Sequence, residues 1–259
     1  MNIFGIILGI IALGLGLNAV HQRRKAAALS NVVRRDIDFL QQLASSMRDT
    51  GFKNYVSLVK GKISCDAPLH SELSNTPCVY YRMSVTRETR ETYDSTDAQG
   101  KIETKTRTVR DVVASNQRSV NFYLNDGTGQ IRVEPSAAEF IGEQVLSRYE
   151  AAAPSAPVAS LQWGNFQLSL PQTQNQVLGY ALEETAIPLN SELYIMGAIS
   201  ESSGELLLSK PQGHEQFLIS VKSDSELLQQ RQNNAKWSVI VAGVLAVAAV
   251  LLFVFGGHK

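Results

Sequence analysis

The sequence is poor in the residues that hold metal ions or build disulfide frameworks. Its 259 residues include two cysteines, Cys65 and Cys78, and four histidines. Two cysteines exclude a disulfide-rich scaffold, and a cytoplasmic domain would keep both reduced. Cys65, His70 and Cys78 could supply three metal ligands, but structural zinc takes four, usually in closely spaced pairs that are missing here. We therefore expect no metal and no cofactor, and we interpret both cysteines as core residues.

The short motifs that mark common enzyme classes are also missing. There is no G-x-S-x-G, Walker loop, H-E-x-x-H or dinucleotide fingerprint. His70 and His214 lie in the middle region, and neither sits in a pattern that supplies a nucleophile partner. The glycine-rich segment 126–129 joins two expected strands, so it lacks the helix dipole that phosphate binding uses. We predict no catalytic residues, which leaves binding, scaffolding or assembly.

The chain carries no net charge of either sign. Its 24 lysines and arginines balance 24 aspartates and glutamates, so no strong field recruits an anionic partner. Clusters in which arginine, lysine and aromatic residues alternate are absent as well. We therefore expect no nucleic-acid partner.

Two uncharged, apolar segments lie near the two ends of the sequence. Ile3–Val20 and Trp237–Phe255 have 18 and 19 residues. As helices they would be roughly 27–29 Å long, about the thickness of a bilayer's hydrocarbon core. A cleaved signal peptide is the alternative for the first segment, but its basic residues follow the apolar stretch and no small-residue cleavage pattern is present. We predict two transmembrane helices.

The cations beside these segments predict their orientation. The basic cluster His21–Lys25 follows the first segment, and Arg231 and Lys236 precede the second. Only His258 and Lys259 follow the second segment. By the positive-inside rule, the middle domain is cytoplasmic and both termini lie outside.

Small residues recur along both predicted spans. They are Gly5, Gly9, Ala12, Gly16 and Ala19 in the first span and Ala242, Ala246 and Ala249 in the second. Small residues let membrane helices approach closely, so the two stripes could form a helical hairpin or join copies into a homo-oligomer. The alternative is that glycine and alanine are simply common in membrane helices.

The predicted organisation has five parts. Residues 3–20 and 237–255 are transmembrane helices, 21–50 an amphipathic linker helix, 51–222 a β-rich domain, and 223–236 a juxtamembrane helix. The fold class is an α+β membrane protein in which two transmembrane helices flank the β-rich domain. Many short strands suggest a small barrel, OB-like in one reading, or else a sandwich, with appended helices.

Helices are predicted from spacing and capping patterns. Apolar residues recur at helical spacing along Leu29–Met47 and stop before Gly51. Ser223–Glu226 fits a capping box, and we expect its helix to continue into the second span without a break. The similar pattern Ser136–Glu139 predicts another helix through about Tyr149.

The remaining apolar segments predict strands. Asp126–Gly129 favours a tight hairpin turn. Thr86–Asp111 is polar and predicts a long solvated hairpin held by cross-strand charge pairs, with a contact arm for a partner as the alternative reading. Ala151–Ser160 contains two prolines and predicts a loop. The expected strands are Tyr55–Ile63, Cys78–Val85, Ser119–Leu124, Gln130–Val133, Phe166–Leu170, Tyr180–Thr185, Glu192–Ile199, Glu205–Leu208 and Gln216–Val221.

Several segments together resemble the GIDE domain, also called the "beside a membrane" (BAM) domain, of Mulan-type mitochondrial RING E3 ubiquitin ligases. They cover most of the chain in the family's order, with the same span–domain–span layout. The segments are Thr76–Arg82, the Phe122–Asp126 hairpin running to Val133–Pro135, Leu193–Gly197, and Ser203–Leu208 followed by Leu227–Gln232.

The resemblance implies a link to ubiquitin ligases but argues against ligase activity in this chain. In those relatives a zinc-binding RING follows the second span, whereas here Gly256–Lys259 follow. A RING needs eight cysteine or histidine ligands in two sets of four, and the chain has only two cysteines and four histidines in total. We expect a non-catalytic module for protein binding or assembly at the membrane. The alternative is an accessory or substrate-engaging part of a ligase-type or other membrane enzyme complex. The relatives place this domain in the mitochondrial intermembrane space, unlike the cytoplasmic side that the charges indicate.

Overall fold

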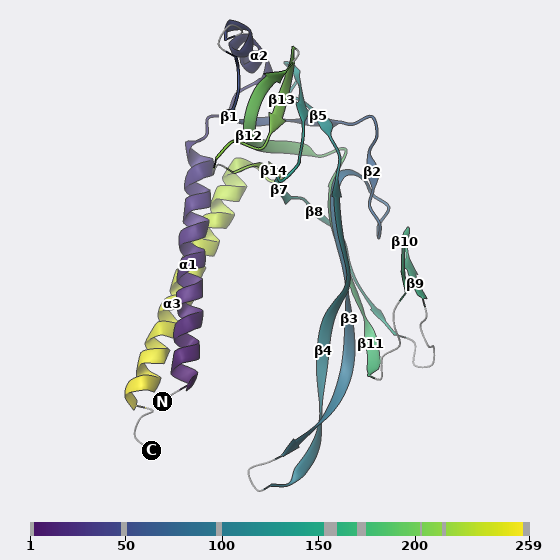
Figure 1. Cartoon of the computed structure of the whole chain (residues 1–259), viewed down its shortest axis with the longest axis vertical. Helices are drawn as coiled ribbons and strands as arrows, with labels where there is room; N and C mark the ends of the chain where they lie inside the picture. The colour runs from purple at the N-terminus through teal and green to yellow at the C-terminus, as the bar shows by residue number, and fades with distance from the viewer. Residues whose placement is uncertain are drawn as a thin grey trace.

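The chain folds into a β-rich domain with a long helix at each end (Figure 1). The computed structural model describes residues 3–47, 51–96, 100–152, 160–169, 175–202, 204–213 and 216–255. Helix α1 spans Ile3–Asn31 and helix α3 spans Asp224–Phe255. Within them, Ile6–Ala27 and Ser225–Val250 are long and apolar enough to cross a membrane. The predicted apolar helices are thus present, and α3 runs on from the juxtamembrane segment without a break, as expected.

Helices α1 and α3 pack against each other as an antiparallel pair, so the start of α1 lies near the end of α3 (Figure 1). On α1 the residues Ala12, Ala19 and Ala26 are buried, and they recur every seven residues. This period is typical of left-handed coiled-coil packing, in which small side chains allow a close approach. Space for a Cβ is open at Gly9 and Gly16. The contact therefore uses Ala12 and Ala19 of the predicted stripe, together with Ala26, which the prediction did not include, and not these two glycines.

The single helix predicted over Leu29–Met47 is interrupted, so that prediction was wrong in part. Helix α1 ends at Asn31, and α2 spans Ile37–Ser46. Between them the backbone pairs with strand β1 (Tyr55–Ser64): the Arg35 amide donates to the Leu58 carbonyl at 3.0 Å, and the Leu58 amide donates to the Val33 carbonyl at 3.3 Å. These long-range hydrogen bonds replace helical ones, because a backbone group can bond to either partner.

Helix α2 is capped by a side chain from a distant turn. The turn joins strands β5 (Phe122–Asn125) and β6 (Gln130–Val133), as predicted. The Ile37 amide donates to Asp126 Oδ2 at 2.7 Å and the Asp38 amide to Thr128 Oγ1 at 3.1 Å. A Cβ on Gly129 would lie 2.8 Å from Ile37 Cγ2, so glycine there lets the helix approach. The carboxylate satisfies amides that a helix N-terminus leaves unpaired.

Five strands close into a barrel. Their order is β1-β5-β6-β13-β12, and β12 pairs with β1 to complete the ring; β12 spans Glu192–Ser202 and β13 spans Glu205–Ser209. The β6–β13 pair is parallel and the others are antiparallel. Side chains from α2 and the strands fill the core, among them Ile37, Leu124 and Ile195. Of the two architectures considered for the domain, the structure shows the barrel.

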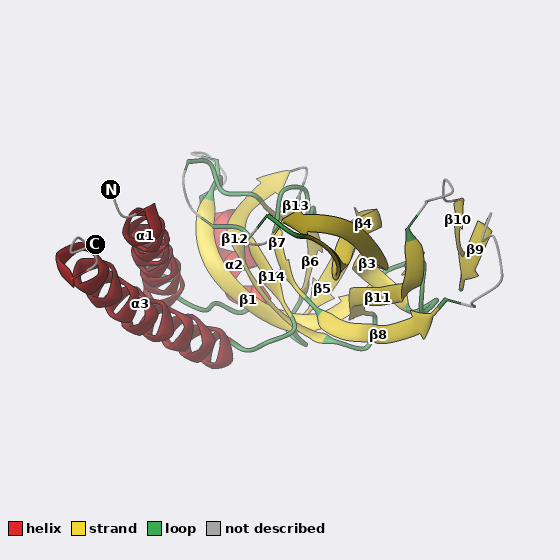
Figure 2. Ribbon diagram, turned by 90° about the horizontal axis from the view of Figure 1, so that it is seen from below, coloured by secondary structure: helices red, strands yellow, loops and turns green. Residues whose placement is uncertain are grey.

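A second sheet extends from the barrel on the side away from the helix pair (Figure 2). It contains β2 (Leu69–His70), β3 (Pro77–Thr96), β11 (Gln176–Pro188) and β8 (Glu143–Ala151), and β4 (Ile102–Ser119) pairs with β3. Its own apolar cluster includes Tyr81, Met83 and Leu182. Trp163 joins this cluster from the small hairpin of β9 (Ser160–Trp163) and β10 (Phe166–Ser169). The chain therefore has two β cores.

The helix predicted from Ser136 to Tyr149 is absent, and that prediction was wrong. The segment forms β7 (Glu139–Ile141) and β8. Strand β7 pairs in parallel with β14 (Leu218–Ser220), which in turn pairs with β12. Long-range strand pairing thus overrides the local capping pattern, and Ala137 has φ of +61°, a left-handed conformation that a helix cannot continue. Most of the loop predicted over Ala151–Ser160 lies outside the described residues.

The polar segment Thr86–Asp111 forms the predicted long hairpin, made by the outer halves of β3 and β4. We call residues 86–96 and 102–111 the arm. Its oppositely charged residues face each other across the strands: Arg87 opposite Asp111, Glu88 opposite Arg110, and Glu91 opposite Arg107. Such exposed pairs are each worth about 0.2–1 kcal/mol. The arm and the helix pair extend to the same side of the barrel (Figure 1).

The cap on α2 predicts an effect of pH on stability. Burial alone would raise the pKa of the Asp126 carboxyl, but hydrogen bonds from the Ile37 amide and from Thr128 and Gly129 outweigh it, and the pKa lies below its ordinary value. A carboxyl whose pKa is depressed by folding stabilises the protein above the unfolded pKa, near 3.9, and loses this effect as the pH falls through the folded pKa.

We therefore expect Asp126→Ala to lower the free energy of unfolding by about 1–2 kcal/mol at pH 7. The difference from the parent should shrink as the pH falls below about 4. Denaturant unfolding followed by circular dichroism measures both values. The exposed Asp66 serves as the control, because Asp66→Ala removes a carboxyl that caps no helix. A pH-independent loss at Asp126 would contradict the capping role.

Candidate functional site

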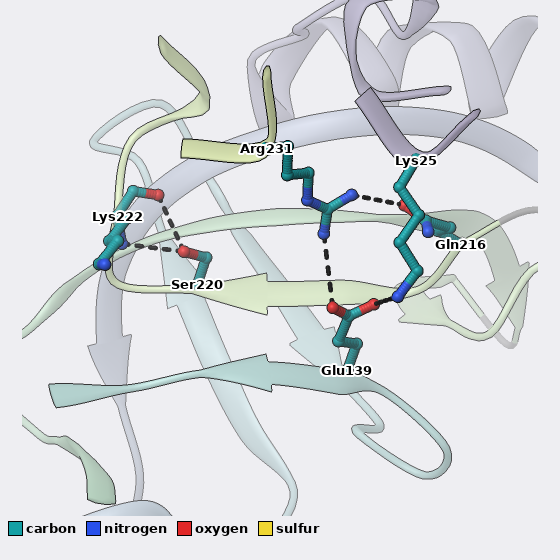
Figure 3. Close-up of polar contacts among 6 residues, drawn as sticks. All are labelled: Lys25, Glu139, Gln216, Ser220, Lys222 and Arg231. Atoms are coloured by element: carbon teal, nitrogen blue, oxygen red, sulfur yellow. Dashed lines mark hydrogen bonds and ion pairs between the residues drawn. The ribbon is translucent and has the colours of Figure 1, made fainter. Parts of the chain in front are cut away.

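The best-defined polar cluster lies where the two long helices meet the barrel. Glu139, at the start of β7, accepts a hydrogen bond from Lys25 Nζ of α1 at 2.7 Å (Figure 3). Its other oxygen lies 3.5 Å from Arg231 Nη2 of α3. Arg231 Nη1 also donates to Gln216 Oε1 at 3.0 Å. We call Lys25, Glu139, Gln216 and Arg231 the junction cluster; it ties both helices to one strand of the domain.

Arg231 is held in place by the packing of its helix. It is only 6 % exposed, and Leu227 and Ala235, one turn before and one turn after it, are buried too. The guanidinium thus lies on the buried face of α3. A charge removed from water needs a counter-charge and hydrogen-bond partners, because an unpaired buried charge costs several kcal/mol. Glu139 and Gln216 supply these partners.

An apolar cluster lies beside the junction cluster. It combines Leu29 of α1 and Leu227 of α3 with Leu58, Met196 and Leu218 from β1, β12 and β14. All five side chains are buried. Burying such side chains supplies about 1.5–3 kcal/mol each, so the helix pair is fixed to the outside of the barrel by apolar packing as well as by charge.

The connection from β14 to α3 is tied down by a series of local hydrogen bonds. The Lys222 amide donates to Ser220 Oγ at 2.9 Å (Figure 3). Ser223 and Glu226 form the predicted capping box: the Ser223 amide donates to Glu226 Oε2 at 2.8 Å, and the Glu226 amide donates to Ser223 Oγ at 3.3 Å. The hydrogen bonds from Ser223 lower the pKa of the Glu226 carboxyl. The capping hydrogen bonds fix the first residue of α3 and therefore the position of Arg231 along the helix.

The candidate metal ligands considered from the sequence do not converge. Cys65 packs against the barrel core, whereas Cys78 is buried in the other apolar cluster, and both are free. His70 lies exposed on β2, and His214 is outside the described residues. In the part of the chain that the structure describes, no three histidine, cysteine, aspartate or glutamate residues are grouped to hold a metal ion. The prediction of no metal remains a prediction.

The buried cysteine, Cys78, does not have the surroundings of a reactive thiol. Burial raises the pKa of the Cys78 thiol to about 11, with the nearby Glu184 carboxylate adding to the shift. At neutral pH this thiol therefore stays protonated, whereas the thiolate is the nucleophile. Cys65 Sγ lies 3.8 Å from the carbonyl oxygen of Asn121. These contacts suit the structural role expected for both residues.

A buried carboxylate that the sequence did not point to organises the loop before β3. Glu184 of β11 is 1 % exposed. It accepts hydrogen bonds from Ser71 Oγ, from the Leu73 amide, and from the amide and hydroxyl of Ser74, at 2.6–2.9 Å. This set of donors satisfies the charge inside the fold. All of these donors come from one short loop, so the arrangement is that of a structural anchor for that loop.

The sequence did not predict the junction cluster either. Lys25 and Arg231 were considered as topology signals and Glu139 as part of a helix cap. Glu139 is 114 residues from Lys25 and 92 from Arg231 along the chain. An arginine on the apolar face of a predicted helix was the one available signal, because such a residue needs a buried partner. The cluster has two cations, a carboxylate and an amide, a set of groups that can hold the two helices in position.

Removing the carboxylate of the junction cluster should therefore destabilise the protein. We expect Glu139→Ala to lower the free energy of unfolding by about 1–3 kcal/mol, because Arg231 loses its counter-charge while it stays buried. Glu143→Ala, which removes an exposed carboxylate four residues further on, is the matched control and should change stability by less than about 0.5 kcal/mol.

A double-mutant cycle with Arg231→Met tests the link directly. Once Arg231 is gone, Glu139→Ala should cost much less than in the parent, because the buried charge no longer needs a partner. Additive losses in thermal or denaturant unfolding of the detergent-solubilised protein would mean that the two residues do not interact energetically.

Comparison with known proteins places this geometry in a family. A family model described as GIDE, E3 ubiquitin ligase, matches residues 90–254, which is more than half of the chain. The match includes Glu139, Gln216 and Arg231 and leaves Lys25 outside. No curated protein and no solved structure matches the chain. The chain therefore belongs to the GIDE family of E3 ubiquitin ligases, as its sequence motifs indicated.

Proposed function

We propose that the protein is a membrane-anchored, non-catalytic GIDE-like module that displays its β-rich domain for protein binding or assembly at the membrane. The observation that carries the proposal is the junction cluster. Two apolar helices pack as one antiparallel pair, and Glu139 binds a cation from each of them. A domain fastened to such a pair is held at the membrane by a two-helix stalk instead of a flexible tether.

In this proposal residues 3–20 and 237–255 span the membrane and residues 51–222 form the GIDE-like domain. The parts between them, 21–50 and 223–236, contain the stalk that raises the domain above the bilayer. The flanking cations favour a cytoplasmic domain with both termini outside. The start of α1 and the end of α3 lie together, as a two-pass arrangement needs (Figure 1).

A non-catalytic role is supported by the composition of the chain and by its buried groups. Two cysteines and four histidines are too few for the paired four-ligand zinc sites of a RING. The buried thiol of Cys78 is protonated at neutral pH, and the buried carboxylate of Glu184 is fully used by loop donors. The buried thiol and the buried carboxylate thus both have surroundings that suit a structural role.

The barrel is OB-like in this proposal. Five strands and a ring order in which β6 neighbours β13 and β1 neighbours β12 support the assignment, because OB folds are five-stranded Greek-key barrels. Such barrels often bind nucleic acids, but the chain as a whole has a net charge of zero and therefore no strong positive field to attract a polyanion. We propose a protein as the partner class.

The direction of the arm constrains how the domain sits on the membrane. The arm extends to the same side of the barrel as the helix pair (Figure 1). Its charged side chains need water, whereas the apolar helices need lipid. We infer that in the membrane the helix pair stays fixed to the barrel and the arm bends out of the bilayer at its base, where the pairing of β3 with β4 shifts register between Val85 and Thr86.

The second candidate function is an accessory or substrate-engaging part of an E3 ubiquitin ligase complex. The description of the matching family favours it. In that case a partner that carries the RING would supply ubiquitin transfer, and this chain would supply the membrane anchor and the binding domain. The identity of the partners bound in the membrane distinguishes the two functions.

Site-specific photocrosslinking in native membranes tests the binding role. Val112 is 64 % exposed on β4, whose outer edge pairs with no strand among the described residues, so a photoreactive residue there samples the surface at the base of the arm. We expect it to capture a defined protein that is not captured from Ser45, an exposed position on α2. Ubiquitin-conjugating or RING proteins among the captured species would favour the second candidate. Equal capture from both positions would contradict binding at the arm.

Labelling of single cysteines tests the placement of the arm. In a Cys65→Ala, Cys78→Ala background, Ile102→Cys puts one thiol at a position that is 67 % exposed. A membrane-impermeant thiol reagent should leave it unlabelled in intact cells and label it after lysis, because the domain faces the cytoplasm and the arm lies in water. Labelling in intact cells would show that the domain lies outside and would contradict the predicted topology. Protection after lysis would place the arm in lipid and contradict the bend at its base.

A further inference from the structure

The boundary between the polar and apolar parts falls at the same height on both long helices. Asn18 Nδ2 of α1 donates to Ser238 Oγ of α3 at 3.4 Å, which aligns the two antiparallel helices. Toward the barrel from this contact, α1 carries Arg23 and Arg24 five and six residues beyond Asn18, and α3 carries Trp237 and Lys236 one and two residues before Ser238. At 1.5 Å per residue the cations of the two helices lie within about 6 Å of each other along the helix axes. The helix pair thus presents cations from both helices at one level.

The cations near this level form two groups with different partners. Lys25 and Arg231 bind Glu139 in the junction cluster. Arg23, Arg24 and Lys236 are exposed, and no carboxylate of the described residues lies within ion-pair distance of them. Lys25 and Arg231 therefore have a structural role in fixing the helices to the domain. The exposed cations Arg23, Arg24 and Lys236 are available to bind an external anion. We call Arg23, Arg24 and Lys236 the free cations.

The free cations border a band of exposed apolar side chains. Leu17 on α1 and Val239 and Ile240 on α3 are exposed on the far side of this level. Trp237 is 66 % exposed at the border itself. Exposed tryptophans at the end of an apolar helix are typical of the headgroup region of a bilayer, where the ring has lipid on one side and water on the other. The free cations therefore lie at headgroup level if the helices span.

We propose that Arg23, Arg24 and Lys236 bind the phosphate groups of anionic lipids and so enrich these lipids around the helix pair. The proposal rests on the proposed membrane anchoring. Guanidinium groups bind phosphate through paired N–H donors, and lysine adds a point charge. Three unpaired cations from two helices converge on one anionic headgroup layer, and their effect falls off within about 10 Å in salt. The positive charge of these residues and their position at headgroup level both favour anionic lipids as the ligand.

Fluorescence quenching of Trp237 tests the proposal in the full chain. The chain has two tryptophans, and Trp163→Phe leaves Trp237 as the only emitter while it keeps an aromatic ring in the second core. The protein is reconstituted into vesicles of zwitterionic phosphatidylcholine. One set of vesicles contains a small fraction of brominated phosphatidylcholine, and a second set contains the same fraction of brominated phosphatidylglycerol. In both lipids the bromine lies near the headgroup end of the acyl chains. The parent with both tryptophans is measured in parallel, so that the comparison does not depend on the Trp163→Phe variant.

Enrichment predicts that the anionic brominated lipid quenches Trp237 several-fold more per mole than the neutral one, and that raising the salt concentration reduces this preference. The triple variant Arg23→Gln, Arg24→Gln, Lys236→Gln should lose the preference. The matched control removes three exposed cations of the domain, Lys53→Gln, Lys62→Gln and Lys210→Gln, and should keep it.

The outcomes separate the two proposals. Equal quenching by both brominated lipids in the parent, or a preference that survives in the triple variant, overturns lipid enrichment and leaves membrane anchoring intact. Absence of quenching by either lipid overturns membrane anchoring itself, because Trp237 then does not lie in the bilayer.

Discussion

The arrangement of the whole molecule depends on how Arg231 is neutralised. Its guanidinium is buried on the inner face of α3, so the fold must bring a carboxylate to it. That carboxylate, Glu139, comes from a strand that exists only because β14 and β12 hold it at the edge of the barrel. Lys25 then joins α1 to the same carboxylate. The barrel, α1 and α3 thus share one charged contact. The apolar cluster around Leu29 and Leu227 packs beside this contact.

The barrel and the arm have different physical supports. Ring closure leaves the five barrel strands paired on both sides, and their shared core is filled by α2, which the β5–β6 turn caps through Asp126. The arm has little apolar surface, and it is maintained by backbone pairing and by ion pairs such as Glu91–Arg107 that lie across the two strands. A rigid base and a polar projection suit a module that presents a surface.

Local patterns in the sequence predicted what local forces determine. The capping box Ser223–Glu226, the turn at Asp126–Gly129 and the charge alternation of the arm each specify their own structure within a few residues, and all were predicted correctly. The helix expected after Ser136 was wrong because the parallel pairing of β7 with β14, about 80 residues away, outweighs a local cap. The junction cluster could not be predicted for the same reason, since its members meet only when the barrel has closed.

The claim that Glu139 fixes the helix pair to the barrel can be measured most directly as a distance distribution in a bilayer. Spin labels on exposed residues, one at Ala27 of α1 and one at Glu205 of β13, report the position of the stalk relative to the barrel in lipid nanodiscs. Pulsed electron paramagnetic resonance should give one narrow distribution of label-to-label distances for the parent and a broad one for Glu139→Ala. The Glu143→Ala variant should give the same distribution as the parent. A distribution that is already broad in the parent, or one that Glu139→Ala leaves narrow, would contradict the account.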